Sequence, residues 1–82
     1  MPNVLRLPGG LRVVIFPNDH RPAHVHVIGA GREAVFKLNC PHGSPQLRES
    51  HGFAARELNA VARALREQMA QLCNAWNRIH GA

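Results

Sequence analysis

The sequence has no tyrosine, one tryptophan and three phenylalanines, so only 5% of its residues are aromatic. A hydrophobic core therefore has to be built mostly from Leu, Val, Ile and Ala. No apolar run approaches the roughly 18 residues that a membrane-spanning helix needs. No basic segment leads into an apolar run at the amino terminus, so no secretion signal is evident. We therefore expect a cytoplasmic protein with no membrane partner.

Acidic residues are also scarce, with five Asp+Glu against ten Lys+Arg and a formal net charge of +5. All the basic residues except Lys37 are arginine, whose planar fork of donors fits phosphate groups. The excess favours an acidic partner, although the same charge also serves to keep a small protein in solution.

The chain has only two cysteines, Cys40 and Cys73. Their spacing matches neither a zinc ribbon nor a disulfide-dense secreted scaffold. We expect both to be free thiols.

With 82 residues the chain has room for a single domain, residues 1–82. A domain of this size buries only about 60–65% of its unfolded surface. We therefore expect a homo-oligomer, or a partner protein that covers additional apolar surface.

Alternating apolar residues and turn signals predict strands over residues 3–7, 11–16, 23–28 and 32–39, and a short edge strand over 46–50. The turns at Pro8-Gly9-Gly10 and Gly29-Ala30-Gly31 connect the first four strands into two hairpins. The strand over residues 11–16 is the most apolar, and we expect it to be central.

From Leu58 to Ile79 the apolar residues recur every three or four positions, which predicts one helix over residues 55–80. Such a helix is about 39 Å long, whereas strands of six residues span about 20 Å. Its far end should overhang the sheet and leave Trp76 and Ile79 in need of another surface, which favours a dimer. The predicted fold class is α+β, with a small antiparallel sheet of four or five strands covered by one long C-terminal helix.

Three of the six histidines, His20, His24 and His26, lie within eight residues. In a strand, alternation sends Val25 and Val27 to one face and His24 and His26 to the other. Residues that lie directly opposite each other on two paired strands share a face of the sheet. The strands over residues 23–28 and 32–39 can therefore both turn their apolar residues to the core only if the numbers of two opposed residues add to an odd value. A value of 61 pairs His24 with Lys37 and His26 with Val35.

The histidine pattern is consistent with a metal site. Imidazoles two residues apart on a strand can converge on one ion while His20 in the loop supplies a third ligand, leaving one position open. The expected cofactor is zinc or another divalent transition metal.

The same face also suits nucleic acid, because alternation places Arg6, Arg12 and Lys37 beside His24 and His26. Without tyrosine for base stacking, binding to RNA or DNA should be directed to phosphates and sensitive to salt. An enzymatic alternative assigns His24 and His26 as general base and general acid in RNA cleavage. A further alternative is a protein-interaction module in which the histidines are structural.

Four segments and a late tryptophan carry a resemblance to a known family: Met1-Pro2-x-Val4-Leu5-Arg6, Asn18-Asp19-His20-x-Pro22-x-His24-Val25-His26-Val27, Glu33-Ala34-x-Phe36, Gly52-Phe53-x-x-Arg56-Glu57-Leu58, and Trp76. Through them the chain resembles small uncharacterised prokaryotic proteins grouped as a domain of unknown function. The chain departs from the family pattern at Ala54, where a capping residue is more usual. The resemblance implies a toxin–antitoxin-like two-gene module with a small cognate partner protein. We therefore expect a component of such a module that binds nucleic-acid phosphates through its sheet face.

Overall fold

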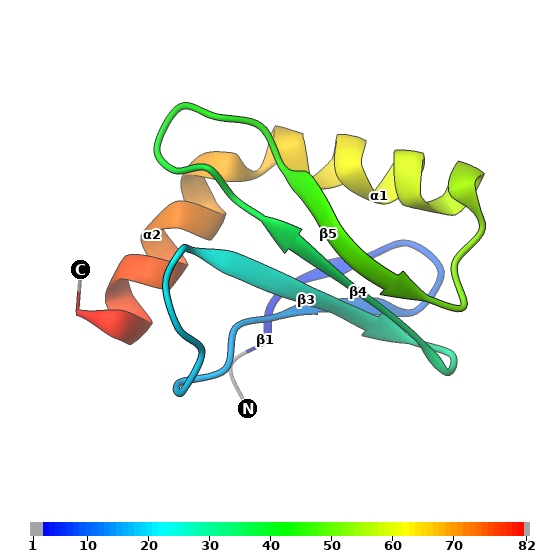
Figure 1. The fold of residues 1–82 in the computed structure, drawn as a ribbon, viewed down its shortest axis with the longest axis horizontal. Helices are drawn as coiled ribbons and strands as arrows, with labels where there is room; N and C mark the ends of the chain where they lie inside the picture. The colour runs from blue at the N-terminus through cyan, green and yellow to red at the C-terminus, as the bar shows by residue number, and fades with distance from the viewer. Residues whose placement is uncertain (1–2, 82) are drawn as a thin grey trace.

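Five antiparallel strands form one sheet in the computed structural model, which describes residues 3–81. They are β1 (Asn3–Leu7), β2 (Leu11–Val14), β3 (His24–Gly29), β4 (Arg32–Lys37) and β5 (Gln46–His51). Each strand from β2 to β5 pairs with the strand before it, which gives the order β1-β2-β3-β4-β5 (Figure 1). The predicted strands and the α+β class are confirmed, but β3 is central instead of the strand over residues 11–16, because β4 and β5 both add beyond it. Met1 and Pro2, which begin the first family segment, lie outside the described residues, as does Ala82.

The predicted register of the second hairpin is confirmed. His24 lies opposite Lys37, and His26 lies opposite Val35. The turn between these strands contains Ala30 with φ 52° and Gly31 with φ 74°. Two residues with positive φ are what a two-residue hairpin turn of type I′ requires, and glycine adopts that conformation without steric cost. The tight turn fixes the register, and the register fixes which side chains face the core.

One face of the sheet forms the hydrophobic core with the helices. Alternate residues of β2, β3 and β4 point into it, and the exposed fraction of each is 1% or less: Val13, Val25, Val27, Ala34 and Phe36. The residues between them, including His24 and His26, lie on the opposite face. The core therefore specifies which face of the sheet presents the histidines.

Two helices, α1 (Ala55–Glu67) and α2 (Met69–His80), replace the single long helix that the periodicity predicts. The break is at Gln68, whose φ of −119° is not helical and whose amide donates to the Leu65 carbonyl oxygen. At 1.5 Å per residue each helix is about 20 Å long or slightly less, which matches the strands. No helix within residues 3–81 is long and apolar enough to cross a membrane.

The change of direction at Gln68 brings α2 against the end of the sheet (Figure 1). Trp76 is only 1% exposed and belongs to the core, and Ile79 packs against that core. The predicted overhang is therefore wrong. The small size of the core is then the remaining reason to expect an oligomer.

Cys40 and Cys73 form a disulfide, so the prediction of free thiols is wrong. The chain brings their Cα atoms to 5.8 Å although 33 positions separate them in the sequence. Cys40 follows β4 and Cys73 lies in α2, so the pairing depends on the docking of a helix that spacing rules do not describe. The bond ties α2 to the sheet three residues before Trp76.

The start of α1 is capped in spite of Ala54. The Glu57 carboxylate accepts a hydrogen bond of 2.9 Å from the Ala54 amide, which is one half of a capping box. The second carboxylate oxygen pairs with the Arg32 guanidinium of β4. The Ala54 amide first, and Arg32 second, hold the pKa of Glu57 below its ordinary 4.5. The cap therefore also links α1 to the sheet.

Candidate metal centre

Asp19 is held in a tight turn that follows β2. Pro17 interrupts the strand, and the Asp19 amide donates a 3.0 Å hydrogen bond to the Phe16 carbonyl oxygen. In return the Phe16 amide donates to Asp19 Oδ2, also at 3.0 Å. Aspartate favours such turns because its carboxylate can bond to nearby backbone. These two bonds fix the position of the carboxylate beside β3.

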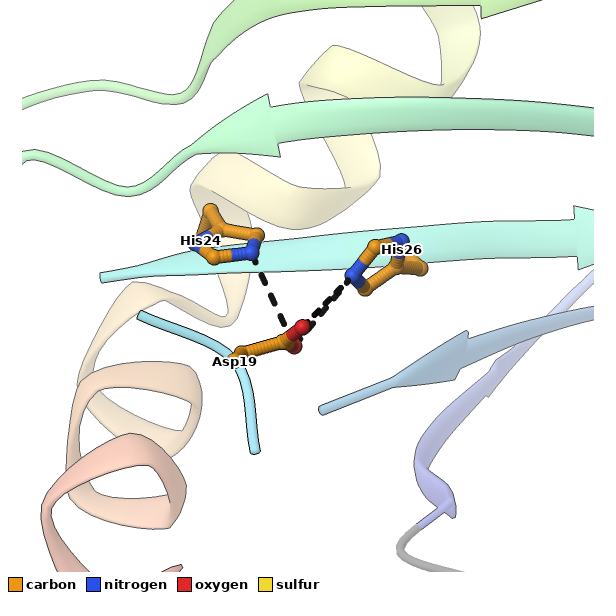
Figure 2. A group of neighbouring side chains, drawn as sticks. All are labelled: Asp19, His24 and His26. Carbon is orange, nitrogen blue, oxygen red and sulfur yellow. Dashed lines mark hydrogen bonds and ion pairs between the residues drawn. The ribbon is translucent and has the colours of Figure 1, made fainter. Parts of the chain in front are cut away.

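His24 and His26 project from β3 toward this carboxylate, as Figure 2 shows. His26 Nε2 lies 3.2 Å from Asp19 Oδ2 and 3.3 Å from Oδ1, while His24 Nε2 lies 3.6 Å from Oδ2. One ligand atom from each of the three residues lies within 4.8 Å of the other two. The side chains are 15–16% exposed, so they are shielded but still accessible.

The second nitrogen of each imidazole faces an oxygen atom. His24 Nδ1 donates to the Pro22 carbonyl oxygen at 2.9 Å, which leaves the lone pair of a neutral ring on Nε2. His26 Nδ1 is buried without a hydrogen bond, and Glu33 Oε2 lies 3.4 Å from it. Histidines that bind metals almost always turn their other ring nitrogen toward a carbonyl or carboxylate in this way.

This arrangement brings three potential metal ligands together. A carboxylate can only accept, so His26 Nε2 either donates its proton to Asp19 at 3.2 Å or, without that proton, needs a cation between the two groups, as the Nε2 lone pair of a neutral His24 does. A metal ion satisfies all three groups at once. The donor set of two imidazoles and one carboxylate is also one that transition metals accept.

Aromatic contacts hold both imidazoles in place. The Phe16 ring meets His26 edge-on, with 4.9 Å between ring centroids. Trp76 from α2 lies 5.3 Å from His24 and stacks on His80 at 3.9 Å. Trp76 thereby connects the core to the candidate centre.

The three side chains open onto a pocket of about 450 Å³. Its wall also contains His20, Arg21 and Arg48, together with the carboxylates of Glu33 and Glu49. A pocket of this volume is within the range that small-molecule ligands occupy. Any ion held by the three side chains has open space on one side.

The sequence predicted two of the three converging residues. His24 and His26 come together as the alternation indicates, whereas His20 is exposed and lines the pocket outside the group. Asp19, which was not among the predicted ligands, takes the place predicted for His20. A carboxylate at the end of a turn just before two strand histidines is the signal that would have identified it.

The basic residues predicted for the nucleic-acid face share the histidine face by pairing. Arg6 lies opposite Arg12, Arg12 lies opposite Ile28 of β3, and Lys37 lies opposite His24. Of the residues that line the 450 Å³ pocket, none is Arg6, Arg12 or Lys37. The face also carries Glu33, so its charge is mixed.

A comparison with protein families matches residues 10–77 to the model described as "Domain of unknown function (DUF4160)". The matched range includes Asp19, His24 and His26. No curated protein and no solved structure matched the chain.

Proposed function

The chain belongs to the DUF4160 family of domains of unknown function, and we propose that it binds a divalent transition metal ion through Asp19, His24 and His26. One observation carries the proposal: three ligand atoms lie within 4.8 Å of one another, while the other nitrogens of both imidazoles face oxygen atoms. In metal sites the second ring nitrogen of a ligand histidine faces a carbonyl or carboxylate oxygen in the same way; His24 already makes that hydrogen bond, and Glu33 lies 3.4 Å from the corresponding nitrogen of His26.

The ligand types indicate which ions to expect. Magnesium and calcium prefer coordination by oxygen alone, whereas imidazole favours zinc, iron, copper and nickel. Two histidines and one carboxylate are the ligands of hydrolytic zinc sites and of non-haem iron(II) sites, both of which keep positions open for water or substrate. The adjoining pocket is consistent with such an open centre.

The general acid and base alternative has weaker support. In RNA cleavage the two groups act on opposite sides of the reacting phosphate, one on the attacking hydroxyl and one on the leaving oxygen. His24 and His26 instead direct their Nε2 atoms at the same carboxylate. This geometry favours chelation over acid and base catalysis.

The test is titration calorimetry with zinc on tag-free protein at pH 7.5. We expect about one equivalent to bind to the wild type, and binding to be lost in Asp19→Asn, His24→Ala and His26→Ala. His20→Ala is the matched control, because His20 lines the pocket outside the group, and it should retain zinc. Equal uptake by the wild type and all four variants, with folding confirmed by circular dichroism, would show that these side chains hold no metal.

A second candidate function is binding to nucleic-acid phosphates through Arg6, Arg12, Lys37 and the histidines. It is supported by the strand pairing, and by the absence of an ion pair to any of these three basic residues within residues 3–81. Three or four phosphate contacts predict a slope of log affinity against log salt near −3, and Arg12→Ala and Lys37→Ala should each reduce the slope by about one. Absence of binding to RNA and DNA at low salt would contradict it.

The expected place in a toxin–antitoxin-like module with a small partner protein stays a prediction, as do the homo-oligomer and the cytoplasmic location. Co-purification with the product of a neighbouring gene tests the partner. Light scattering at tens of micromolar tests the oligomer.

A further inference from the structure

Two arginines reach the pocket beside the candidate centre from different parts of the fold. Arg21 comes from the loop that precedes β3, and Arg48 comes from the edge strand β5, two strands away from β3. Both side chains are exposed, and neither makes an ion pair with a carboxylate in the part of the chain that the structure describes. Two exposed arginines that make no ion pair among the described residues therefore line the pocket.

The charge of the pocket depends on the metal. Without an ion, the carboxylates of Asp19, Glu33 and Glu49 outnumber Arg21 and Arg48, so an anion is repelled. A divalent ion on Asp19 reverses the balance and becomes the largest local charge in the site. The loaded pocket is then positive, while the empty one is slightly negative.

We infer that the metal-loaded pocket binds the phosphate group of a phosphate ester, with one phosphate oxygen on the ion and others on Arg21 and Arg48. This inference rests on the proposed metal centre. Phosphate is the anion that matches these groups, because it offers several oxygens to a metal at one side and to guanidinium forks at the others. The volume of about 450 Å³ exceeds that of a bare phosphate and leaves room for the rest of an ester such as a nucleotide.

This site is distinct from the broad basic face made by Arg6, Arg12 and Lys37, none of which lines the pocket. Binding to that face needs no metal and depends on the number of phosphates contacted. Binding in the pocket needs the metal and a single phosphate. The dependence on metal is therefore the property that separates the two.

The experiment compares zinc-loaded and zinc-free protein by calorimetry, with inorganic phosphate, a nucleoside monophosphate and a short RNA as separate probes. We expect all three to bind the loaded wild type, and phosphate to bind the zinc-free protein at least tenfold more weakly. Preference for the nucleotide or the RNA over phosphate identifies the source of the ester, and either preference supports the inference.

Arg21→Gln and Arg48→Gln should each weaken phosphate binding about tenfold or more, the factor expected for a lost hydrogen bond to a charged group, while leaving zinc uptake intact. Arg63→Gln, on the exposed surface of α1, is the matched control and should bind as the wild type does. Normal zinc uptake without phosphate binding, or phosphate binding that is equal with and without zinc, would overturn this inference and leave the metal centre standing. Failure to take up zinc would overturn both.

Discussion

The Cys40–Cys73 disulfide should contribute a large part of the stability of this small domain. Its 33-residue span gives a loop-closure entropy worth about 3.7 kcal/mol at 25 °C. A domain of 82 residues has roughly 4–12 kcal/mol of unfolding free energy in total. Removing the bond should therefore cost about a third of the stability or more.

The double variant Cys40→Ala/Cys73→Ala tests this in urea, with the fluorescence of Trp76 as the probe. Trp76 is the single tryptophan and is 1% exposed, so its emission reports the loss of packing between α2 and the sheet. With a denaturant slope of about 1–3 kcal/mol/M, the midpoint should fall by more than about 1 M. Reductant should produce a similar fall in the wild type, where no side chain is truncated.

The double variant in reductant is the control, and its midpoint should not move. Two results would refute the reasoning. One is two reactive thiols in the unreduced, denatured wild type. The other is a midpoint that neither reductant nor the double substitution lowers. The first would restore the free thiols that the sequence predicts, and the second would show that the bond contributes nothing to stability.

Four further outcomes are expected. Ala54→Ser should complete the capping box and raise the unfolding free energy by about 0.5–1 kcal/mol in chemical denaturation, because Ala54 already has the extended backbone of an N-cap; no change would mean that the box does not form. Glu57→Gln should destabilise the protein above pH 4.5, because the ionised carboxylate holds both the cap and Arg32. The difference in unfolding free energy from the wild type should vanish as the pH falls through the lowered pKa of Glu57. A difference that persists in acid would exclude a charge effect. Phe36→Ala should cost about 3–5 kcal/mol in the same assay, because the ring is 1% exposed in the core; a loss below 1 kcal/mol would contradict this packing. Glu33→Gln should weaken zinc binding about 10- to 100-fold in calorimetry, through the loss of the carboxylate beside the ligand imidazole; unchanged affinity would remove it from the centre.

Period-2 alternation predicted the strands and limited the second hairpin to the few registers that bury the valines, one of which is the observed pairing of His24 with Lys37. The same local logic placed both histidines on one face. It gave the wrong central strand, since strand order depends on which edges later segments occupy. The short-range pattern of apolar residues is thus sufficient to predict the hairpin that presents the imidazoles.

The features that the sequence missed all depend on tertiary contacts. The apolar stripe runs through Gln68 without interruption, so nothing local marks the break between α1 and α2. The Cys40–Cys73 pair forms only once α2 is docked. Aspartate is a common turn residue, and the role of Asp19 as a candidate ligand appears only when the turn folds against β3.

The strict alternation of β3 also governs which misfolded forms the protein can adopt. A slip of β3 by one residue against its neighbours would expose Val25 and Val27 and bury His24 and His26 beneath the helices. Exposing two valines and desolvating two imidazoles costs roughly 5–12 kcal/mol, as much as the whole domain gains by folding. A mispaired chain therefore has no stable state to occupy, and it remains open to chaperones and proteases until it pairs correctly. Correctly folded molecules present both imidazoles on the outer face, so the correct arrangement of the site follows from the correct pairing of the sheet.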